Sequence, residues 1–205
     1  MHLAINMVAT LDGRAAIGGT ATGIGSAYDR HLMKELRAEV DVVLHGAGTV
    51  RADPLSARVP AELIAGRVAR GMTPQPLGAI VTRSGNLPVK HPYYDSPTVI
   101  YVLSDATVAV ANVEICRVAD LRDMIGDLAQ RGATRILCEG GPRLNAALLE
   151  AGLVDELHFT LAPKLAGGAD PLTIVHGGSF PIVALSLLEV AQREDELFLR
   201  YAVRR

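Results

Sequence analysis

Short apolar runs alternate with amphipathic stretches along this chain, and that alternation constrains the fold more than any other feature. Leu3–Asn6 reads as a strand, Ser26–Val40 as a helix that opens on a serine N-cap, and Asp41–His45 as the next strand. Within the helical stretch, apolar residues at Leu32 and Leu36 fall on one face. Strands that alternate with helices predict an α/β fold.

The rest of the chain continues the pattern and then changes character. We expect further helices over 61–71 and 119–132, and further strands over 77–82, 98–104, 113–118 and 134–139. The strand-like runs 154–168, 185–192 and 196–203 have no helix-length segment between them. The sheet is therefore expected to end in antiparallel strands.

Composition excludes several classes of function. The 205 residues are 49% hydrophobic, enough for the core of one domain. The formal net charge of −2, with acidic and basic residues interspersed, argues against a nucleic-acid partner. Cys116 and Cys138 are too few for a disulfide framework, which fits a reducing cytoplasm, and no apolar segment reaches the length of a bilayer.

A glycine-rich turn joins the strand over 134–139 to the helix that follows it. Gly140 and Gly141 make the turn, and Pro142 stands where the first helical residue should be. A helix N-terminus of this kind can bind a phosphate through its free N–H groups. The alternative is a merely convenient strand-to-helix connection. Glu139, a carboxylate at the end of an apolar strand, favours a ligand site.

Gly46 and Gly48 form a second glycine turn after the strand over 41–45. Arg51 stands where the dinucleotide fingerprint would have its third glycine, so that motif is absent. Two glycine turns at strand ends in one small α/β chain suggest two walls of one cleft. The cleft is a hypothesis that rests on their convergence.

Other chemical signatures are missing. The six histidines show no metal-ligand spacing, and no nucleophile motif is present. His45 is expected to be a structural histidine, and Arg37 and Arg58 suit a phosphate but equally suit a solvated surface. Without a metal or a nucleophile, a cofactor is left to supply the chemistry.

The sequence resembles the reductase domain of the riboflavin-biosynthesis pyrimidine deaminase/reductase family. Three segments carry the resemblance: MVATLDGRAA, ELRAEVDVVLHGAGTVRAD and ILCEGGPRLNAALLEAGLVDELHFTLAPKLAGG. The resemblance implies a dihydrofolate-reductase-like, three-layer α/β/α fold with a mixed central sheet, and a homodimer. It also implies an oxidoreductase that transfers hydride from NADPH to C1′ of a ribosylaminopyrimidine 5′-phosphate and opens the ribose into a ribityl chain.

The resemblance also implies roles for individual residues. On the cofactor side it places Ala9, Thr49, Asp53, Ser84 and the turn Gly140, Gly141, Pro142, Arg143, Leu144 and Asn145. On the substrate side it places Asn6, Ser26, Arg37, Leu55, Arg58 and Glu139. No residue is assigned as the catalytic acid, for which Asp53 and Glu139 are the candidates, and no metal is expected.

Three departures from the family bear on function. The bifunctional bacterial enzymes carry a zinc deaminase domain, whereas we expect residues 1–205 to form a single reductase domain without one. Asn6 stands where those enzymes have lysine and is similar to the asparagine of the stand-alone archaeal type, which favours a 2,5-diaminopyrimidinone substrate over the deaminated 5-aminouracil form. Arg83 stands where aspartate is common, beside Ser84.

Three other functions stay open. A true dihydrofolate reductase would share the fold, and Asp29 falls on the expected helix, but the chain has no tryptophan and so lacks the Pro-Trp segment of those enzymes. A reductase of a secondary pathway would act on another carbonyl or imine. A nucleotide-binding protein would keep the fold without turnover.

Overall fold

The computed structural model describes residues 1–169 and 172–204. Its internal contacts divide the chain into two compact units. The first unit comprises Met1–His2 and Lys34–Leu137, and the second comprises Leu3–Met33 and the chain from Cys138 onward. Each unit is described separately.

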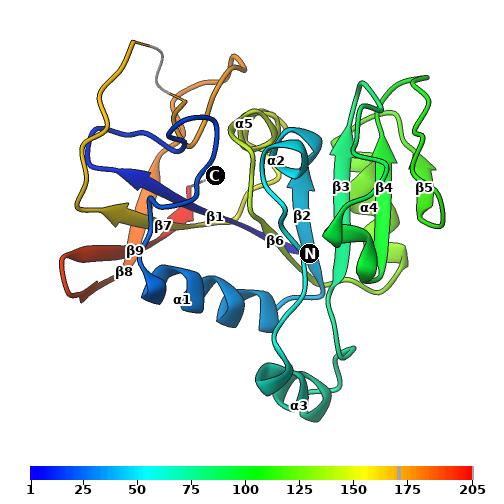
Figure 1. Ribbon diagram of the computed structural model, residues 1–205, viewed down its shortest axis with the longest axis horizontal. Helices are drawn as coiled ribbons and strands as arrows, with labels where there is room; N and C mark the ends of the chain where they lie inside the picture. The colour runs from blue at the N-terminus through cyan, green and yellow to red at the C-terminus, as the bar shows by residue number, and fades with distance from the viewer. Residues whose placement is uncertain (170–171, 205) are drawn as a thin grey trace. The chain divides into compact units, whose positions relative to one another are not determined.

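The first unit contains five strands in the order β5, β4, β3, β2, β6, and the strands from β2 to β5 are paired in parallel. The pairs Val42–Leu77, Gly78–Thr98 and Val99–Glu114 fix the parallel register from β2 to β5 (Figure 1). Because these strands are parallel, their carboxyl ends lie at one edge of the sheet. The strands are β2 (Val42–Gly46), β3 (Leu77–Thr82), β4 (Thr98–Val102), β5 (Glu114–Arg117) and β6 (Arg135–Cys138).

Most helices of the first unit begin where the sequence supplies a capping side chain or a proline, whereas the helix after Gly46 begins without either. Asp120 caps α4 (Leu121–Gln130) by accepting from the N–H groups of Arg122 and Asp123, and Leu121, Met124 and Leu128 form its buried face. The other helices are α2 (Ala47–Ala52), α3 (Ala61–Ala69) and the short 3-10 helix η1 (Pro92–Asp95).

Two buried polar side chains fix the first unit internally. His45 is 1% exposed, and its Nδ1 lies 3.1 Å from the Tyr93 hydroxyl, so its expected structural role is confirmed. Arg67 is fully buried, and its Nη1 donates to the carbonyls of Arg37 and Ala38, the last two residues of α1 (Ala27–Ala38), and of Val40, which follows that helix. These carbonyls have no partner within the helix, so Arg67 serves as their cap.

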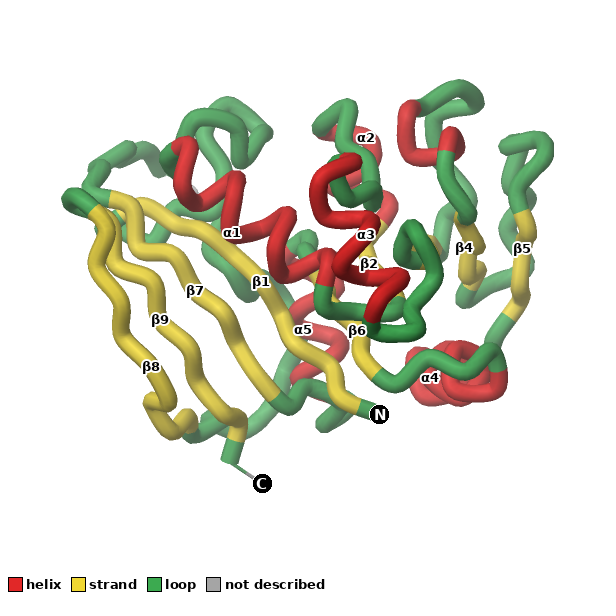
Figure 2. Tube along the Cα trace, turned by 90° about the horizontal axis from the view of Figure 1, so that it is seen from below, coloured by secondary structure: helices red, strands yellow, loops and turns green. Residues whose placement is uncertain are grey.

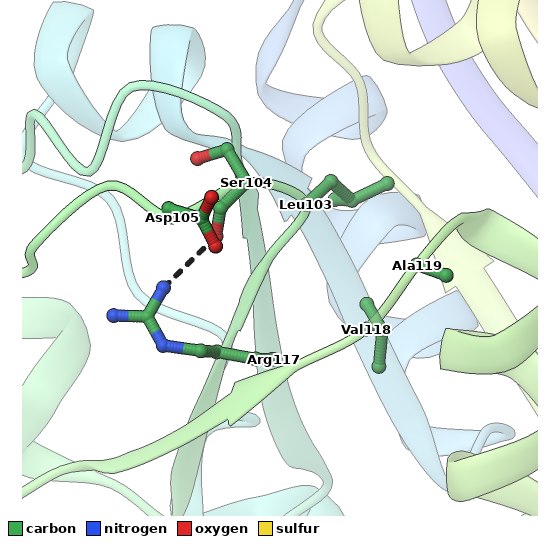
Figure 3. A pocket seen from close by; sticks show the side chains of 6 residues that line it. All are labelled: Leu103, Ser104, Asp105, Arg117, Val118 and Ala119. Carbon is green, nitrogen blue, oxygen red and sulfur yellow. Dashed lines mark hydrogen bonds between the residues drawn. The ribbon is translucent and has the colours of Figure 1, made fainter.

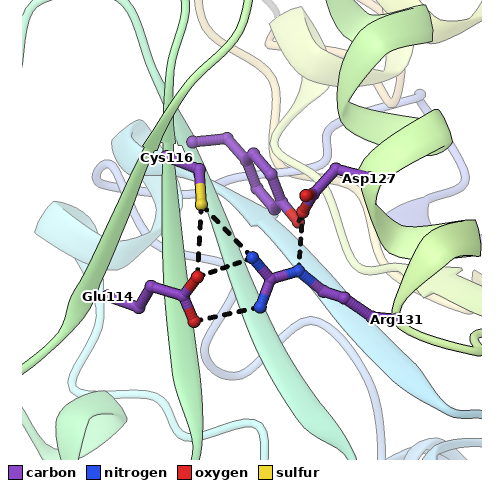
Figure 4. Close-up of polar contacts among 5 residues, drawn as sticks. Glu114, Cys116, Asp127 and Arg131 are labelled. Carbon is purple, nitrogen blue, oxygen red and sulfur yellow. Dashed lines mark hydrogen bonds and ion pairs between the residues drawn. The ribbon is translucent and has the colours of Figure 1, made fainter.

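An acid and arginine network joins β5 to α4 (Figure 4). The Arg131 guanidinium donates to both carboxyl oxygens of Glu114, at 2.9 and 2.6 Å, and to Asp127 at 2.6 Å. Asp127 also accepts from the hydroxyl of buried Tyr101. Hydrogen bonds from Arg131 lower the pKa of both carboxyls, so this cluster is satisfied as it stands.

The second unit is built on four neighbouring strands, β1 (His2–Thr10), β7 (Glu156–Ala162), β9 (Glu196–Val203) and β8 (Leu185–Arg193) (Figure 2). β1 and β7 are parallel, whereas β9 runs antiparallel to both β7 and β8. The helices α1 (Ala27–Ala38) and α5 (Pro142–Glu150) complete the list, and the last residues of α1 belong to the first unit.

The sequence predictions agree with most of these elements. The α/β class, the antiparallel end and the Ser26 cap of α1 are confirmed, since the Ser26 hydroxyl accepts from the N–H groups of Tyr28 and Asp29. One reading was wrong: Gly48 lies inside the short helix α2, with Gly46 as its N-cap, rather than in a glycine loop. Among the described residues, no helix is long and apolar enough to cross a membrane.

Candidate active site

Strand β1 separates the predicted residues of the second unit by face. Side chains alternate along a strand, so Asn6 and Val8 share one face, while Met7 and Ala9 share the other. A Cβ built on Gly140 would lie 3.0 Å from the Met7 sulfur, so the glycine turn approaches the Met7 and Ala9 face. Ala9, predicted on the cofactor side, and Asn6, predicted on the substrate side, therefore point to opposite sides of β1.

The turn before α5 has the geometry expected of a helix N-terminus. Gly140 has φ of +86°, the Gly140–Gly141 peptide is cis, and Pro142 is the first helical residue. The N–H groups of Leu144 and Asn145 already donate to the Gly141 carbonyl, and Pro142 has none. Among the described residues, no hydrogen bond uses the N–H groups of Gly141 and Arg143, which leaves both for an anion.

Asn145, also predicted on the cofactor side, is fully buried. Its amide donates to the Ile174 carbonyl at 2.8 Å and accepts from the Cys138 thiol at 3.5 Å. Burial raises the pKa of that thiol to about 12, so Cys138 is an inert core group. The Asn145 side chain thus holds a neighbouring loop in place.

Two motifs of the sequence meet through Asp12 of the T-L-D-G turn. Its carboxylate accepts from the Gly167 N–H at 2.8 Å and from the Ala166 N–H at 3.2 Å, and the Thr10 hydroxyl also donates to it. The Thr10 hydrogen bond is the largest cause that lowers the pKa of Asp12 to about 2. Asp12 therefore joins the A-P-K-L-A-G-G run to the end of β1.

Lys164 of the same run holds the loop that leads into α1. Its ammonium donates to the Gly23 and Ile24 carbonyls, both at 2.7 Å. Ser26 follows and caps the helix, and its N–H donates to Glu196 Oε1 at 2.8 Å. The start of α1 is therefore fixed from both β7 and β9.

In the first unit, Thr49, Asp53 and Ser84 follow the carboxyl ends of two adjacent parallel strands. Thr49 lies on α2 after β2, Asp53 is the C-cap of α2, and Ser84 comes directly after β3. The Asp53 carbonyl accepts from His91 Nε2 at 3.0 Å. This edge of a parallel sheet is where ligands bind in α/β proteins.

A hollow of about 360 Å³ lies one strand further along the same edge (Figure 3). Its lining comes from the ends of β4 and β5, and the Arg117 guanidinium donates to the Ser104 carbonyl at 2.8 Å. The Ser104 hydroxyl in turn donates to the Arg83 carbonyl. The lining residues are Leu103, Ser104, Asp105, Arg117, Val118 and Ala119.

The two predicted arginines differ in exposure. Arg58 is exposed, whereas Arg37 is 7% exposed and its Nη1 lies 3.4 Å from the Arg58 carbonyl. Arg37 therefore supports the segment that carries Arg58. Leu55, half-buried, lies on the same segment, where its N–H donates to the Asp53 carbonyl.

The predicted residues thus form two groups, one in each unit. The first unit holds Arg37, Thr49, Asp53, Leu55, Arg58 and Ser84. The second holds Asn6, Ala9, Ser26, Glu139 and Gly140 to Asn145.

Comparison with known proteins identifies the family. The family model described as the RibD C-terminal domain matches residues 1–199. The chain belongs to this family. It is 29% identical to the 2,5-diamino-6-ribosylamino-4(3H)-pyrimidinone 5′-phosphate reductase of Methanothermobacter thermautotrophicus, with 99% of this chain and 98% of that protein covered.

Solved structures show the fold of RibD C-terminal domains in this chain. A pyrimidine reductase-like protein from Corynebacterium diphtheriae matches with a TM-score of 0.87 at 20% identity, covering 100% of this chain and 92% of that one. Dihydrofolate reductase from Enterococcus faecalis matches with a TM-score of 0.56 at 12% identity, covering 100% and 97%. The expected dihydrofolate-reductase-like fold is confirmed.

Sequence reasoning missed one group that the structure brings together. Asp29 and Glu196 both contact the segment that begins α1, although they lie near opposite ends of the chain. Asp29 carried a signal, as an acid in the first turn of a capped helix. Glu196 carried none, because an acid at the start of a hairpin strand is usually a solvated charge.

Proposed function

We propose that this protein is the NADPH-dependent reductase that converts a ribosylaminopyrimidine 5′-phosphate into its ribitylaminopyrimidine counterpart in riboflavin biosynthesis. The observation that carries the proposal is the Gly140–Gly141 turn, which brings an anion-binding helix end against β1. Membership of the RibD C-terminal domain family, and the name of the Methanothermobacter relative, support it.

A nicotinamide cofactor, when bound, supplies the hydride. The residues present fit such a group, since Gly141 and Arg143 have N–H groups for a diphosphate, and a side chain on Gly140 would close the approach to Met7. Ala9 would add an apolar surface on the same face of β1. The dihydrofolate reductase that shares the fold was solved with NADP(H), which agrees with this choice.

The preference for NADPH over NADH rests on the first unit. Thr49, Asp53 and Ser84 would hold the adenosine end, and Arg83 beside Ser84 is exposed. Within the described chain, no hydrogen bond or ion pair engages the Arg83 guanidinium, so it is available for a 2′-phosphate.

In the second unit, the proposed substrate residues are Asn6, Ser26 and Glu139. In the first unit, the exposed Arg58 is the proposed phosphate ligand, its backbone is held by Arg37, and Leu55 lies on the same segment. Asn6, the asparagine of the stand-alone type, and the diaminopyrimidinone in the name of the relative both favour the 2,5-diamino substrate.

The chain's contribution to catalysis is then positioning. Binding both reactants at fixed orientation makes the step effectively unimolecular, and no covalent nucleophile is needed. Asp53 and Glu139 are the sequence candidates for the acid, and the main-chain carbonyl of Asp53 accepts from His91 at the end of α2.

The direct test is NADPH oxidation with the 2,5-diaminopyrimidinone ribosyl phosphate and the 5-aminouracil form in parallel assays. Turnover of the first alone supports the proposal with Asn6 as a specificity residue, and turnover of the second alone places the enzyme after deamination. Turnover of dihydrofolate instead, or NADPH binding without oxidation of any of the three, would contradict the proposed function.

We also propose a single reductase domain, a homodimer and a cytoplasmic location. The location rests on Cys116 and Cys138, both free thiols. The dimer rests on the family and on β8, an edge strand of the second unit whose Leu187, Leu188 and Val190 are 49–54% exposed. Light scattering would contradict the dimer if the mass stayed near 21.7 kDa at assay concentration.

A further inference from the structure

Two carboxyl groups meet at the start of α1 without a basic partner. Ser26 connects them: its hydroxyl accepts from the Asp29 N–H at 3.2 Å, and its own N–H donates to Glu196 Oε1 at 2.8 Å. Glu196 is the first residue of β9 and is only 5% exposed. Within the described chain, no ion pair includes either acid.

Gly25 makes room for the Asp29 carboxyl. A Cβ built on Gly25 would lie 2.1 Å from Asp29 Oδ2 and 2.6 Å from its Cγ, so any side chain there would displace the carboxyl. Gly25 does not have a positive φ, so space rather than backbone conformation requires the glycine. The Asp29 carboxyl therefore lies against Gly25, and the Glu196 carboxyl accepts a hydrogen bond from the N–H of Ser26, the next residue.

The second oxygen of Glu196 is left without a partner. Oε2 is buried and accepts no hydrogen bond from any described residue. A buried unsatisfied carboxylate oxygen is costly, and such groups in native proteins are expected to meet a ligand or a proton. This unpartnered oxygen indicates that the acid pair is a site for a ligand.

The charged groups around the pair do not neutralise it. Arg30 on α1 directs its Nη1 to the Gly25 carbonyl at 3.2 Å, and Lys164, after β7, is engaged by two carbonyls. Arg193 on β8 lies over the Tyr28 ring, 5.8 Å from its centroid. The remaining neighbour, Glu139 after β6, is another acid.

These surroundings raise the pKa of Asp29 above its ordinary value. Burial raises its pKa most, and the charges of Glu196 and Glu139 raise it further. A hydrogen bond from the Thr160 hydroxyl and the charge of Arg30 oppose the rise without cancelling it. Asp29 is only partly buried, so a ligand can reach it.

Asp29 lies on the substrate face of β1. Thr160, its hydrogen-bond partner on β7, is paired with Val8 in the parallel register, and Asn6 is paired with His158. Because in-register neighbours and residues two apart share a face, Asn6 and Thr160 point to the same side. The Asp29 carboxyl is therefore on the side of the sheet that carries Asn6.

We propose that Asp29 is the proton donor of the reduction, held ready by the neighbouring negative charge of Glu196. This inference rests on the proposed function. The Asp29 proton passes to the furanose ring oxygen as the C1′–O4′ bond breaks and its electron pair goes to that oxygen. The exocyclic nitrogen lone pair forms the C1′=N bond.

Hydride, which a bound nicotinamide cofactor would supply, would then add to C1′ as the C1′=N electron pair returns to nitrogen, so the substrate would gain one hydride and one proton. Asp29 is reprotonated from water. In this arrangement Glu196 is a positioning residue that acts through Asp29.

The test compares Asp29→Asn with Glu35→Gln, an exposed acid on the same helix. Asp29→Asn should lower kcat by about 10²-fold or more, the usual contribution of a general acid, and should remove the alkaline limb of the pH profile. Glu196→Gln should shift that limb to lower pH while keeping turnover on its acid side, and the exposed neighbour Asp195→Asn should shift nothing.

A titration of the protein without cofactor or substrate tests the pair independently of activity. Carbon-13 NMR of the Asp29 carboxyl should show a raised pKa that falls in Glu196→Gln. If the wild type reduces substrate but Asp29→Asn matches it at every pH, the proton-donor inference is wrong and the function stands. If the wild type reduces no substrate, the proposed function is wrong. If Asp29 titrates at its ordinary pKa, the proposed interaction between Asp29 and Glu196 is wrong.

Discussion

The two units of this chain treat their acidic residues in opposite ways. In the first, Glu114 and Asp127 are both bound by Arg131, and hydrogen bonds from that arginine lower the pKa of each carboxyl (Figure 4). In the second, Asp29 and Glu196 meet beside the cap of α1 with no basic partner among the described residues, and burial raises the pKa of Asp29.

The contrast separates groups that stabilise the fold from groups held for a ligand. A satisfied network close to the surface contributes modestly to stability and requires nothing from outside. A buried acid pair with an unpartnered oxygen lowers stability, and proteins retain such features where function needs them. The expected effects of substitution therefore differ in sign between the two units.

The largest difference is expected between two glycine-to-alanine substitutions, one in each unit. Gly140→Ala must place a side chain at φ of +86° and 3.0 Å from the Met7 sulfur, so it should destabilise the protein by about 1–3 kcal/mol and weaken NADPH binding at least tenfold. Gly126→Ala in α4 meets nothing within 4 Å and should stabilise by about 0.5–1 kcal/mol. Thermal unfolding measures the stability of each variant, and titration with NADPH measures its affinity. If the two variants have the same stability and affinity, the Gly140 turn has no particular role in cofactor binding.

The second effect concerns the acid pair. The raised pKa of Asp29 means that the unfolded chain loses this proton first, so wild-type stability falls as pH rises from the ordinary value of 3.8 through the folded one. Asp29→Asn should therefore be more stable than wild type by about 0.5–2 kcal/mol at pH 8. The difference should disappear near pH 3.

Denaturant unfolding across pH measures this difference. Glu196→Gln should follow Asp29→Asn in sign, because it removes the charge that opposes ionisation of Asp29. A loss of stability at pH 8 in both variants would mean that the pair stabilises the fold, and the contrast between the units would not hold.

The smallest effect belongs to the first unit. Arg131→Gln removes the partner of Glu114 and Asp127, both near the surface, and should cost about 0.2–1 kcal/mol, less at high salt. Turnover should not change. Thermal unfolding at two salt concentrations, with a turnover assay, checks this, and a tenfold fall in activity would show that the network serves the site.

Much of the fold was accessible from local signals. Ser26, Asp120 and Pro142 mark the starts of three helices, and the tail without helix-length segments predicted the antiparallel strands. The short helix α2 was missed because Gly46 and Gly48 read as a loop, although the residues around them bury Ala47 and Val50 and favour a helical turn. Tertiary packing there overrides glycine propensity.

The candidate site was accessible only in part. The Gly140 turn has a local signature, and the structure gives it the expected helix N-terminus. The meeting of Asp29 with Glu196, and of Asp12 with Gly167, depends on strands that pair across most of the chain, which no local pattern records. The side chain of Asn145 turned inward for the same reason, since its partner is Ile174.

The central claim is that this chain delivers hydride to C1′ of a ribosylaminopyrimidine phosphate. The most direct measurement uses NADPH deuterated at C4 of the nicotinamide, with the position of the label in the product determined by NMR. We predict one deuterium at C1′ of a ribityl chain. Label at any other carbon, or a product that keeps its ribose ring, would contradict the account.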